Sequence, residues 1–355
     1  TIITAVAPKK AIVIKTTKQT KVAITVLMGD PTLPDVVKRD GQFNPEDFET
    51  INKLQTALKT LPQYNFNFYN DHKNFIRKFL QHPPQFVLNL CDEGWNNKAT
   101  MELHPPALMD MLNIPYSGAN PECLSLCYNK SFVRAIAHEM DITVPSEIWI
   151  DPSNQSAALP SIFPAIVKPA YGDSSIGITE HAVVNTAEEL VFWFDELKRT
   201  LPTVPILVQE FLQGREFSVG IIGNGDALEI LPILEVDYDQ LPSHLPPILG
   251  YESKWLPDSP YWKTIRYRHA QLDDTAQKTL IDSSLNLFQR LKCRDYARFD
   301  FRMNLHNEIK LLEVNPNSSW CWDGKMTLMG EFIGLSYAQI LEKIIQAALE
   351  RSQLR

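Results

Sequence analysis

Two short segments near the C-terminus of the chain carry polar side chains at the spacing of β-strands. Residues 296–301 read Tyr-Ala-Arg-Phe-Asp-Phe, and residues 311–317 read Leu-Leu-Glu-Val-Asn-Pro-Asn. Side chains alternate between the two faces of a strand, so the polar groups of each segment share one face. These polar groups are Arg298, Asp300, Glu313 and Asn315. The opposite face is predicted to enter a core through Phe299, Phe301, Leu312 and Val314.

The two segments are predicted to pair as a hairpin. A two-residue turn at residues 306–307 would place Asp300 opposite Glu313 and Arg298 opposite Asn315. Two carboxylates that face each other repel unless a cation lies between them. Mg²⁺ prefers oxygen ligands and commonly binds one or two carboxylates together with substrate phosphates. The hairpin therefore predicts half of a magnesium-nucleotide site, and the alternative is a solvated hairpin with a charged outer face.

A second segment, residues 166–178, places a lysine at the end of an apolar strand before a loop of small residues. The lysine is Lys168, and the loop includes Ser174. Small residues allow backbone N–H groups to approach phosphate oxygens, and a lysine supplies a point charge. The segment has only two glycines and is not a Walker A motif. It is consistent with a phosphate-binding loop or with a tight hairpin that bears a solvated lysine.

A third segment, residues 207–217, has the composition of a linker between two strands that binds an adenosine. Phe211 and Leu212 could contact an adenine ring, and Glu216 could accept hydrogen bonds from a ribose diol. The backbone of the linker could contact the edge of the base. The alternative is a β-turn in which Glu216 forms a surface ion pair.

The elements that must position these groups begin with alternating strands and helices. Strands are predicted at residues 21–29, 66–69 and 86–90, and helices at residues 46–60 and 75–80. This alternation is typical of an α/β domain with a parallel sheet.

The later part of the chain contains further strands and helices. Asn120-Pro121-Glu122 is typical of a helix start. Helices are predicted at residues 130–140, 187–197, 275–291 and 337–351, and strands at residues 165–168, 206–209 and 216–222. Residues 237–263 contain five prolines and no periodicity, so we expect a long mobile loop that acts as a lid.

Composition excludes several classes of protein. The net charge of −8 and the lack of a basic stripe argue against a nucleic-acid partner. Eight histidines without a paired spacing argue against zinc, and five scattered cysteines favour reduced thiols. No apolar run reaches the length of a membrane span, and the first residues do not resemble a signal peptide. We expect a cytoplasmic protein without membrane contact.

The order of these motifs resembles the ATP-grasp fold and, within it, the D-alanine–D-alanine ligase family. The resemblance runs from about Phe86 to the C-terminus, and it implies ATP and Mg²⁺ as cofactors, with two metal ions that Mn²⁺ can replace. It implies that ATP is bound by Lys130, Lys168, Ser174, Gln209, Glu210, Phe211, Leu212, Glu216 and Lys254. It also implies catalytic roles for Arg298, Lys254 and Ser174, and metal ligation by Asp300, Glu313 and Asn315.

The same resemblance implies a domain organisation and a homodimer. Residues 1–20 would form an N-terminal extension, and residues 21–125 an N-terminal α/β domain that precedes the ATP-grasp fold. Residues 126–205 would form its central subdomain and residues 206–355 its C-terminal subdomain, with the lid at 237–263.

Three departures from the family concern its amino-acid pockets. Residues 28–31 lack the family's Gly-Gly loop and nearby glutamate, and residues 90–95 replace its His-Gly pattern. The family's Pro-Gly-Met-Thr segment and serine give way to residues 317–325. Candidate substrate residues there are Asn317, Trp320, Trp322 and Lys325. D-alanine is therefore a poor candidate substrate and a bulkier, ring-containing one is favoured, unless the tryptophans belong to the core and the lysine is solvated.

By resemblance, ATP phosphorylates a carboxylate or an equivalent oxygen, and an amine then displaces the phosphate to form a C–N bond. One candidate joins serine or another amino acid to mycosporine-glycine, whose vinylogous acid would be phosphorylated. The alternatives are a true D-alanine–D-alanine ligase or another dipeptide ligase, a phosphotransferase without ligation, and a non-catalytic nucleotide-binding regulator.

Overall fold

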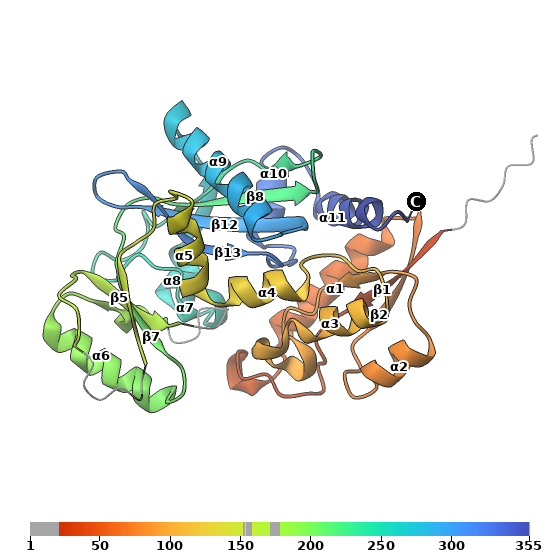
Figure 1. The fold of residues 1–355 in the computed structure, drawn as a ribbon, viewed down its shortest axis with the longest axis horizontal. Helices are drawn as coiled ribbons and strands as arrows, with labels where there is room; N and C mark the ends of the chain where they lie inside the picture. Colours follow the sequence, from red (N-terminus) through yellow and green to blue (C-terminus); the bar gives the residue numbers. More distant parts are fainter. Residues whose placement is uncertain (1–20, 152, 154–157, 171–177, 355) are drawn as a thin grey trace, which may run out of the picture.

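The computed structural model of the chain describes residues 21–151, 153, 158–170 and 178–354. These residues form three β-sheets with helices packed around them (Figure 1). No helix in these ranges combines the length and the apolar character needed to cross a membrane. All five cysteines are free thiols, as predicted.

The N-terminal sheet is parallel, which confirms the predicted strand–helix alternation. Its order is β2 (Tyr64–Tyr69), β1 (Val22–Leu27) and β3 (Val87–Asn89). Two helices connect these strands, α1 (Pro45–Lys59) and α2 (Phe75–Gln81). Because the carboxyl ends of parallel strands meet at one edge, the loops after β1 and β3 lie side by side.

The C-terminal helix returns to this sheet. Helix α11 (Tyr337–Arg351) packs Leu341 and Ile345 into the same core as Ile24 and Val26 of β1. The last helix therefore joins the N-terminal sheet to the C-terminal part of the fold (Figure 1).

The central sheet is antiparallel, in the order β4 (Glu147–Ile150), β7 (Ile206–Glu210), β5 (Ala165–Pro169) and β6 (Val183–Val184). Helix α6 (Ala187–Thr200) packs on it through a row of buried residues at helical spacing: Leu190, Phe194 and Leu197. This pairing places the end of β5 beside β7 and thereby sets the position of Lys168.

The C-terminal sheet has the order β11 (Arg266–His269), β10 (Leu234–Asp237), β8 (Glu216–Gly223), β12 (Asp295–Met303) and β13 (Ile309–Asn315). The short strand β9 (Glu229–Ile230) also pairs with β8. The helices whose side chains share the core of this sheet are α4 (Pro121–Tyr128), α5 (Lys130–Glu139) and α9 (Asp274–Arg290). Other elements are α3 (His104–Met111), α10 (Lys325–Glu331) and the 3₁₀ turns Arg39–Gly41, Trp95–Asn97, Ala99–Met101 and Glu180–Ala182.

The β12–β13 hairpin confirms the predicted register at the polar residues, but the predicted turn is wrong. Asp300 pairs with Glu313, whereas Phe301 pairs with Leu311 because a bulge interrupts the ladder. The turn has one residue more than expected, with Asn307 in the left-handed region, and the bulge compensates for it. As a result Leu311 is buried in the core, and Leu312 does not take the core position that we predicted.

The prediction that residues 237–263 form a loop without regular structure is also wrong in part. The segment contains helix α7 (Tyr251–Trp255), and helix α8 (Pro260–Thr264) begins within it. Ser259 accepts a hydrogen bond from the backbone of Trp262, which caps α8. Prolines that break a long periodic pattern are compatible with short helices of this kind.

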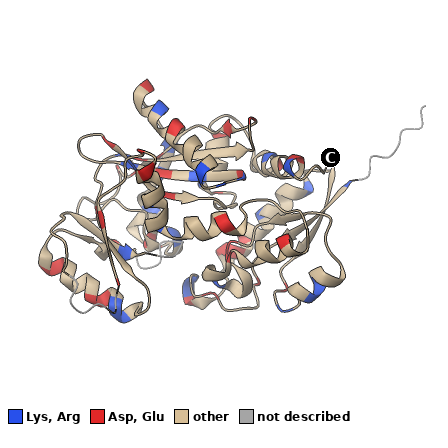
Figure 2. Cartoon of the chain, in the orientation of Figure 1, with Lys and Arg blue, Asp and Glu red and all other residues tan. Residues whose placement is uncertain are grey.

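Acidic and basic residues are interspersed over the fold. In the coloured part of the chain, the view in Figure 2 shows no continuous stripe of lysine and arginine.

Candidate functional site

A cavity of about 770 Å³ lies where the three sheets approach one another. Its lining includes Gly29 from the end of β1, Lys168 from β5, and Asp300 from β12. Side chains far apart in the sequence therefore meet in one space, and most of the predicted site residues are among them.

The polar groups of the β12–β13 hairpin form one connected cluster. Arg298 donates hydrogen bonds of 2.9 to 3.2 Å to both carboxylate oxygens of Asp300. The amide nitrogen of Asn315 lies 3.2 Å from Asp300 Oδ2 and 3.3 Å from Glu313 Oε1, and donates to both. Asn315 thus bridges the two carboxylates.

Nearby cations keep both carboxylates ionised. Burial raises the pKa of Asp300, but Arg298 and Lys325 outweigh it, so the pKa lies well below its ordinary value. Burial also raises the pKa of Glu313, but the net shift is downward, chiefly because of Lys130, whose Nζ lies 3.5 Å from Glu313 Oε2. The cluster therefore offers two charged oxygen ligands at neutral pH.

Lys325 approaches this cluster from the first position of α10. Its ammonium donates to Ser218 Oγ at 2.9 Å and lies 3.6 Å from Asp300 Oδ1. Ser218 is fully buried on β8, and its hydroxyl in turn donates to Asp300. Lys325 is consequently a fixed part of the cavity wall and not a solvated surface lysine.

Lys168 is buried at the end of β5. Its ammonium donates a hydrogen bond of 2.9 Å to Gln209 Oε1, and the Gln209 amide donates to Glu147 at 2.7 Å. Burial and the neighbouring Lys130 lower the pKa of Lys168 to about 8. A buried cation with a lowered pKa gains from the approach of an anion.

An apolar part of the cavity lies beside Lys168. Its walls include Ile166, Ile178, Phe211 and Leu312. The bulge in β13 turns the side chain of Leu312 toward this cavity and away from the core. Such surfaces suit the faces of an aromatic base.

The predicted ribose contact, Glu216, lies at the border of this apolar part. Its carboxylate accepts a hydrogen bond of 2.7 Å from Tyr238 and lies 3.3 Å from Arg302 Nη1. It lines the cavity and therefore remains available to a ligand on that side.

Four predicted site residues do not join the described cavity wall. Ser174 lies outside the described residues. Glu210 forms an ion pair of 2.9 Å with Lys310, and Leu212 is buried, so only their backbones remain candidates for contacts with a base. Trp322 lies against Lys53, whose ammonium is 4.8 Å from its ring.

The predicted substrate residues Asn317 and Trp320 do line the cavity, as Lys254 does. Trp320 donates from its indole nitrogen to Asp92 Oδ1 at 3.1 Å. This bond holds the ring in place between the loop after β3 and the start of α10.

Sequence reasoning missed the contribution of the N-terminal sheet to this wall. Lys38 and Glu93 line the cavity, and Ser218 donates a hydrogen bond to Asp300 from β8 behind the cavity wall. Glu93 follows a predicted strand, so its place at the carboxyl edge of the parallel sheet could have been expected. Lys38 lies in a loop and has no comparable signal.

Comparison with known proteins shows which family this chain resembles. The family model described as "D-ala D-ala ligase C-terminus" matches residues 146–346. The D-alanine–D-alanine ligase of Aquifex aeolicus is 28% identical over 270 residues, which cover 76% of this chain and 84% of that protein.

Solved structures agree in fold. The D-alanine–D-alanine ligase of Bacillus anthracis complexed with ATP superimposes with a TM-score of 0.69 at 19% identity, over 94% of this chain and 99% of that one. The VanG D-Ala:D-Ser ligase of Enterococcus faecalis gives a TM-score of 0.68 at 17% identity, over 93% and 100%. The expected α/β ATP-grasp fold is confirmed. Since the family model spans more than half of the sequence, the chain belongs to the D-alanine–D-alanine ligase family and is an ATP-dependent ligase that forms C–N bonds.

Proposed function

We propose that this ligase phosphorylates a carboxylate or vinylogous acid other than D-alanine and joins it to an amino acid. The observation that carries the proposal is the convergence of cations on the acidic hairpin. The basic residues that line the cavity near Asp300 and Glu313 are Lys130, Lys168, Lys254, Arg298 and Lys325. Such a set can neutralise the phosphates of ATP and the charge on a transferring phosphoryl group.

The residues present fit Mg²⁺. In the described ranges, no group of three or more His, Cys, Asp or Glu side chains could hold a metal ion, so a site here depends on an amide as well. Asp300, Glu313 and Asn315 would hold Mg²⁺, with phosphate oxygens completing the ligand set, and the Asn315 amide would then turn its oxygen toward the carboxylates in place of its nitrogen. The ion would neutralise charge on the phosphates.

Arg298 and Lys325 would then act on the reacting group. Both form ion pairs with Asp300, and a metal bound to that carboxylate would compete with these contacts. Arg298 would contact the transferring phosphoryl group, and Lys254 would approach it from the lid segment. The segment 237–263, which we propose as a lid, would exclude water from the phosphorylated intermediate.

We further propose the domain boundaries and the homodimer expected from the sequence. ATP would contact Lys130, Lys168, Gln209, Phe211 and Glu216, with Ser174 and the backbones of Glu210 and Leu212 completing the contacts. The part of the cavity near Trp320 would then hold the other substrates.

The pocket near Trp320 favours substrates larger than D-alanine. Its indole lines the cavity and is held by Asp92, so a small methyl side chain would leave apolar surface unfilled. We propose mycosporine-glycine as the phosphorylated substrate and serine as an amine. D-alanine is the competing candidate, because the relatives named above are D-alanine–D-alanine and D-Ala:D-Ser ligases.

The test is a matrix of substrates. Phosphate and ADP release by the purified protein are measured with ATP and Mg²⁺ over carboxylates, mycosporine-glycine and amino acids, including D-alanine. We expect release that requires both a ring-bearing acid and an amino acid. Fastest release with D-alanine would refute the proposed substrate, release without an amine would indicate a phosphotransferase, and no release with any pair would indicate a nucleotide-binding regulator.

A further inference from the structure

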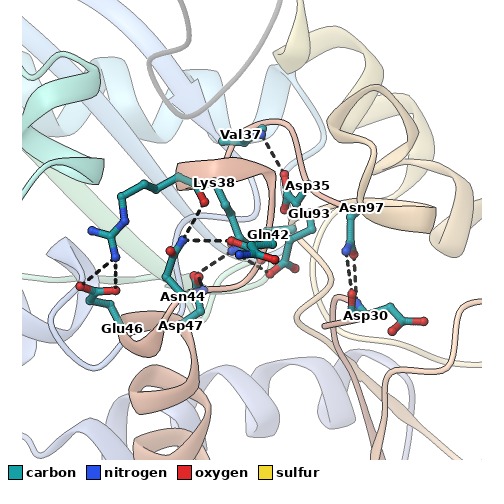
Figure 3. A network of polar contacts seen from close by, with 12 residues as sticks. Asp30, Asp35, Val37, Lys38, Gln42, Asn44, Glu46, Asp47, Glu93 and Asn97 are labelled. Atoms are coloured by element: carbon teal, nitrogen blue, oxygen red, sulfur yellow. Dashed lines mark hydrogen bonds and ion pairs between the residues drawn. The ribbon is translucent and has the colours of Figure 1, made fainter. Parts of the chain in front are cut away.

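A buried lysine from the N-terminal part of the chain lies in the cavity wall. Lys38 precedes α1 and lines the cavity that also holds the acidic hairpin. Its side chain is only 7% exposed. Figure 3 shows Lys38 together with the carboxylates of Asp47 and Glu93.

The ammonium of Lys38 has too few hydrogen-bond partners for a buried cation. It donates to Asp47 Oδ1 at 2.9 Å and lies 3.5 Å from Glu93 Oε1, and one face of the Phe43 ring lies 4.4 Å away. An ammonium has three donors, and among the described residues only the bond to Asp47 has hydrogen-bonding geometry. Unfilled donors on a buried charge are costly, which indicates that an acceptor is supplied by a ligand.

Glu93 provides the complementary charge next to Lys38. Its Oε2 is buried without a hydrogen-bond donor within the described ranges, and the carboxyl of Asp92 lies next to Glu93. A Cβ atom at Gly29 would lie 2.5 Å from the carboxylate carbon of Glu93, so glycine at the end of β1 leaves the room that this side chain occupies. The pair therefore presents a donor and an acceptor side by side in one wall.

We infer that Lys38 and Glu93 bind an α-amino-acid unit of the substrate that becomes phosphorylated, its carboxylate at Lys38 and its N–H at Glu93. In such a unit one carbon separates the nitrogen from the carboxylate, so a cation and an anion 3.5 Å apart can each contact one of the two groups. Because Lys38 holds the α-carboxylate, the substrate must carry a second acidic oxygen that accepts the phosphoryl group, as an N-substituted glycine with a vinylogous acid does. This inference rests on the proposed ligase function and narrows its substrate class.

The position of Lys38 also connects this unit to the lid segment. Its ammonium lies 5.6 Å from the centre of the Trp255 ring, on α7, and Lys254 is the adjacent residue. A substrate held at Lys38 would therefore lie beneath the segment that carries a proposed catalytic lysine. Asp47 accepts the Lys38 hydrogen bond and also caps α1, so it is a positioning residue.

The first experiment replaces the charge without shortening the side chain. Lys38→Met should raise the Michaelis constant for mycosporine-glycine at least about tenfold, the loss expected for a hydrogen bond to a charged group, and leave that for ATP within twofold. Lys53→Met is the matched control, since Lys53 lies on α1 against Trp322 and outside the cavity lining. Equal constants in Lys38→Met and wild type would overturn the inference.

A second variant separates binding from folding. Lys38→Met alone would leave the carboxylates of Asp47 and Glu93 without their cation. A triple variant therefore combines Lys38→Met with Asp47→Asn and Glu93→Gln, and its thermal unfolding is compared with that of the wild type. If this variant folds and still binds mycosporine-glycine as tightly as wild type, Lys38 and Glu93 are merely a structural ion pair and the inference fails.

A titration without ATP makes the outcome independent of turnover. Calorimetry with mycosporine-glycine and with its methyl ester should show weaker binding of the ester by about tenfold in the wild type and no difference in Lys38→Met. The same titration is made with glycine and serine. The inference is refuted if the wild type binds the acid and its ester equally well, or if it binds none of these probes. If the wild type discriminates between acid and ester but releases no ADP, only the ligase function is refuted.

Discussion

Asp300 lies opposite Glu313 in the β12–β13 hairpin, and both carboxylates accept hydrogen bonds from Asn315. Two anions in this position, one buried and one partly buried, require cations, and the cavity supplies these from β5, β12 and the helices α5, α7 and α10. The arrangement of charge, and not any single side chain, makes this wall of the cavity suitable for a metal-bound triphosphate.

Removal of one of these carboxylates should abolish turnover. Asp300→Ala or Glu313→Ala would eliminate a proposed Mg²⁺ ligand and leave the surrounding cations with excess charge. We expect phosphate release to fall far more than tenfold at saturating Mg²⁺. The control is Asp282→Ala on the exposed surface of α9, which should behave as wild type. Turnover within about tenfold of the wild type would contradict the metal assignment.

Lys168 should serve nucleotide binding at the expense of stability. Lys168→Met would weaken the binding of a non-hydrolysable ATP analogue by at least about tenfold and spare substrate binding. The lowered pKa indicates that burial of this charge costs stability, and removal of that cost offsets the loss of the hydrogen bond to Gln209, so we expect little change in the unfolding temperature. Calorimetry and thermal unfolding measure the two effects, and unchanged nucleotide affinity would show that Lys168 is not a phosphate ligand.

Nucleotide affinity should depend on pH through the same lysine. The pKa of Lys168 is lowered to about 8, so the free protein loses this positive charge as the pH rises through 8. A bound triphosphate favours the charged form, so affinity should fall between pH 8 and 10, and binding near pH 8 should take up a proton. Calorimetry in two buffers with different ionisation enthalpies measures that uptake. Lys168→Met should remove the pH dependence, and a wild type without it contradicts the assignment.

Stability should depend on the buried carboxylate of Asp295, which accepts hydrogen bonds from residues far apart in the chain. Arg351 of α11 donates to both oxygens of Asp295 at 2.7 and 2.8 Å, and Gly118 donates its N–H to the same fully buried carboxylate. Asp295→Asn should lower the free energy of unfolding by about 3 to 5 kcal/mol, because Arg351 loses its charged partner. Denaturant unfolding tests this, with Lys292→Ala at an exposed ion pair as the control, for which a change below about 1 kcal/mol is expected.

The sequence allowed the acidic hairpin to be predicted more accurately than the rest of the cavity. Alternation along β12 determines which side chains share a face, and the bulge at Leu312 cancelled the error in the turn. A bulge depends on packing around the hairpin and leaves no clear pattern in the residues. Lys38 was missed because its role arises from contacts with residues that are distant in the chain, Glu93 and Trp255.

Two tryptophans that appeared equivalent in the sequence should differ in function. Trp320 lines the cavity and is held by Asp92, whereas Trp322 contacts Lys53 outside the lining formed by the described residues. Trp320→Ala should raise the Michaelis constant for mycosporine-glycine by roughly tenfold or more, since a large aromatic contact is lost, and leave that for ATP unchanged.

Trp322→Ala is the matched control, because it removes the same side chain two residues away. It should leave both Michaelis constants within twofold of the wild type. If the two variants lose the same affinity, the tryptophans act only by supporting the fold, which a common fall in melting temperature would reveal. If Trp320→Ala leaves the Michaelis constant for mycosporine-glycine within twofold of the wild type, the indole does not contact this substrate and the interpretation of a pocket built for a larger ring is wrong.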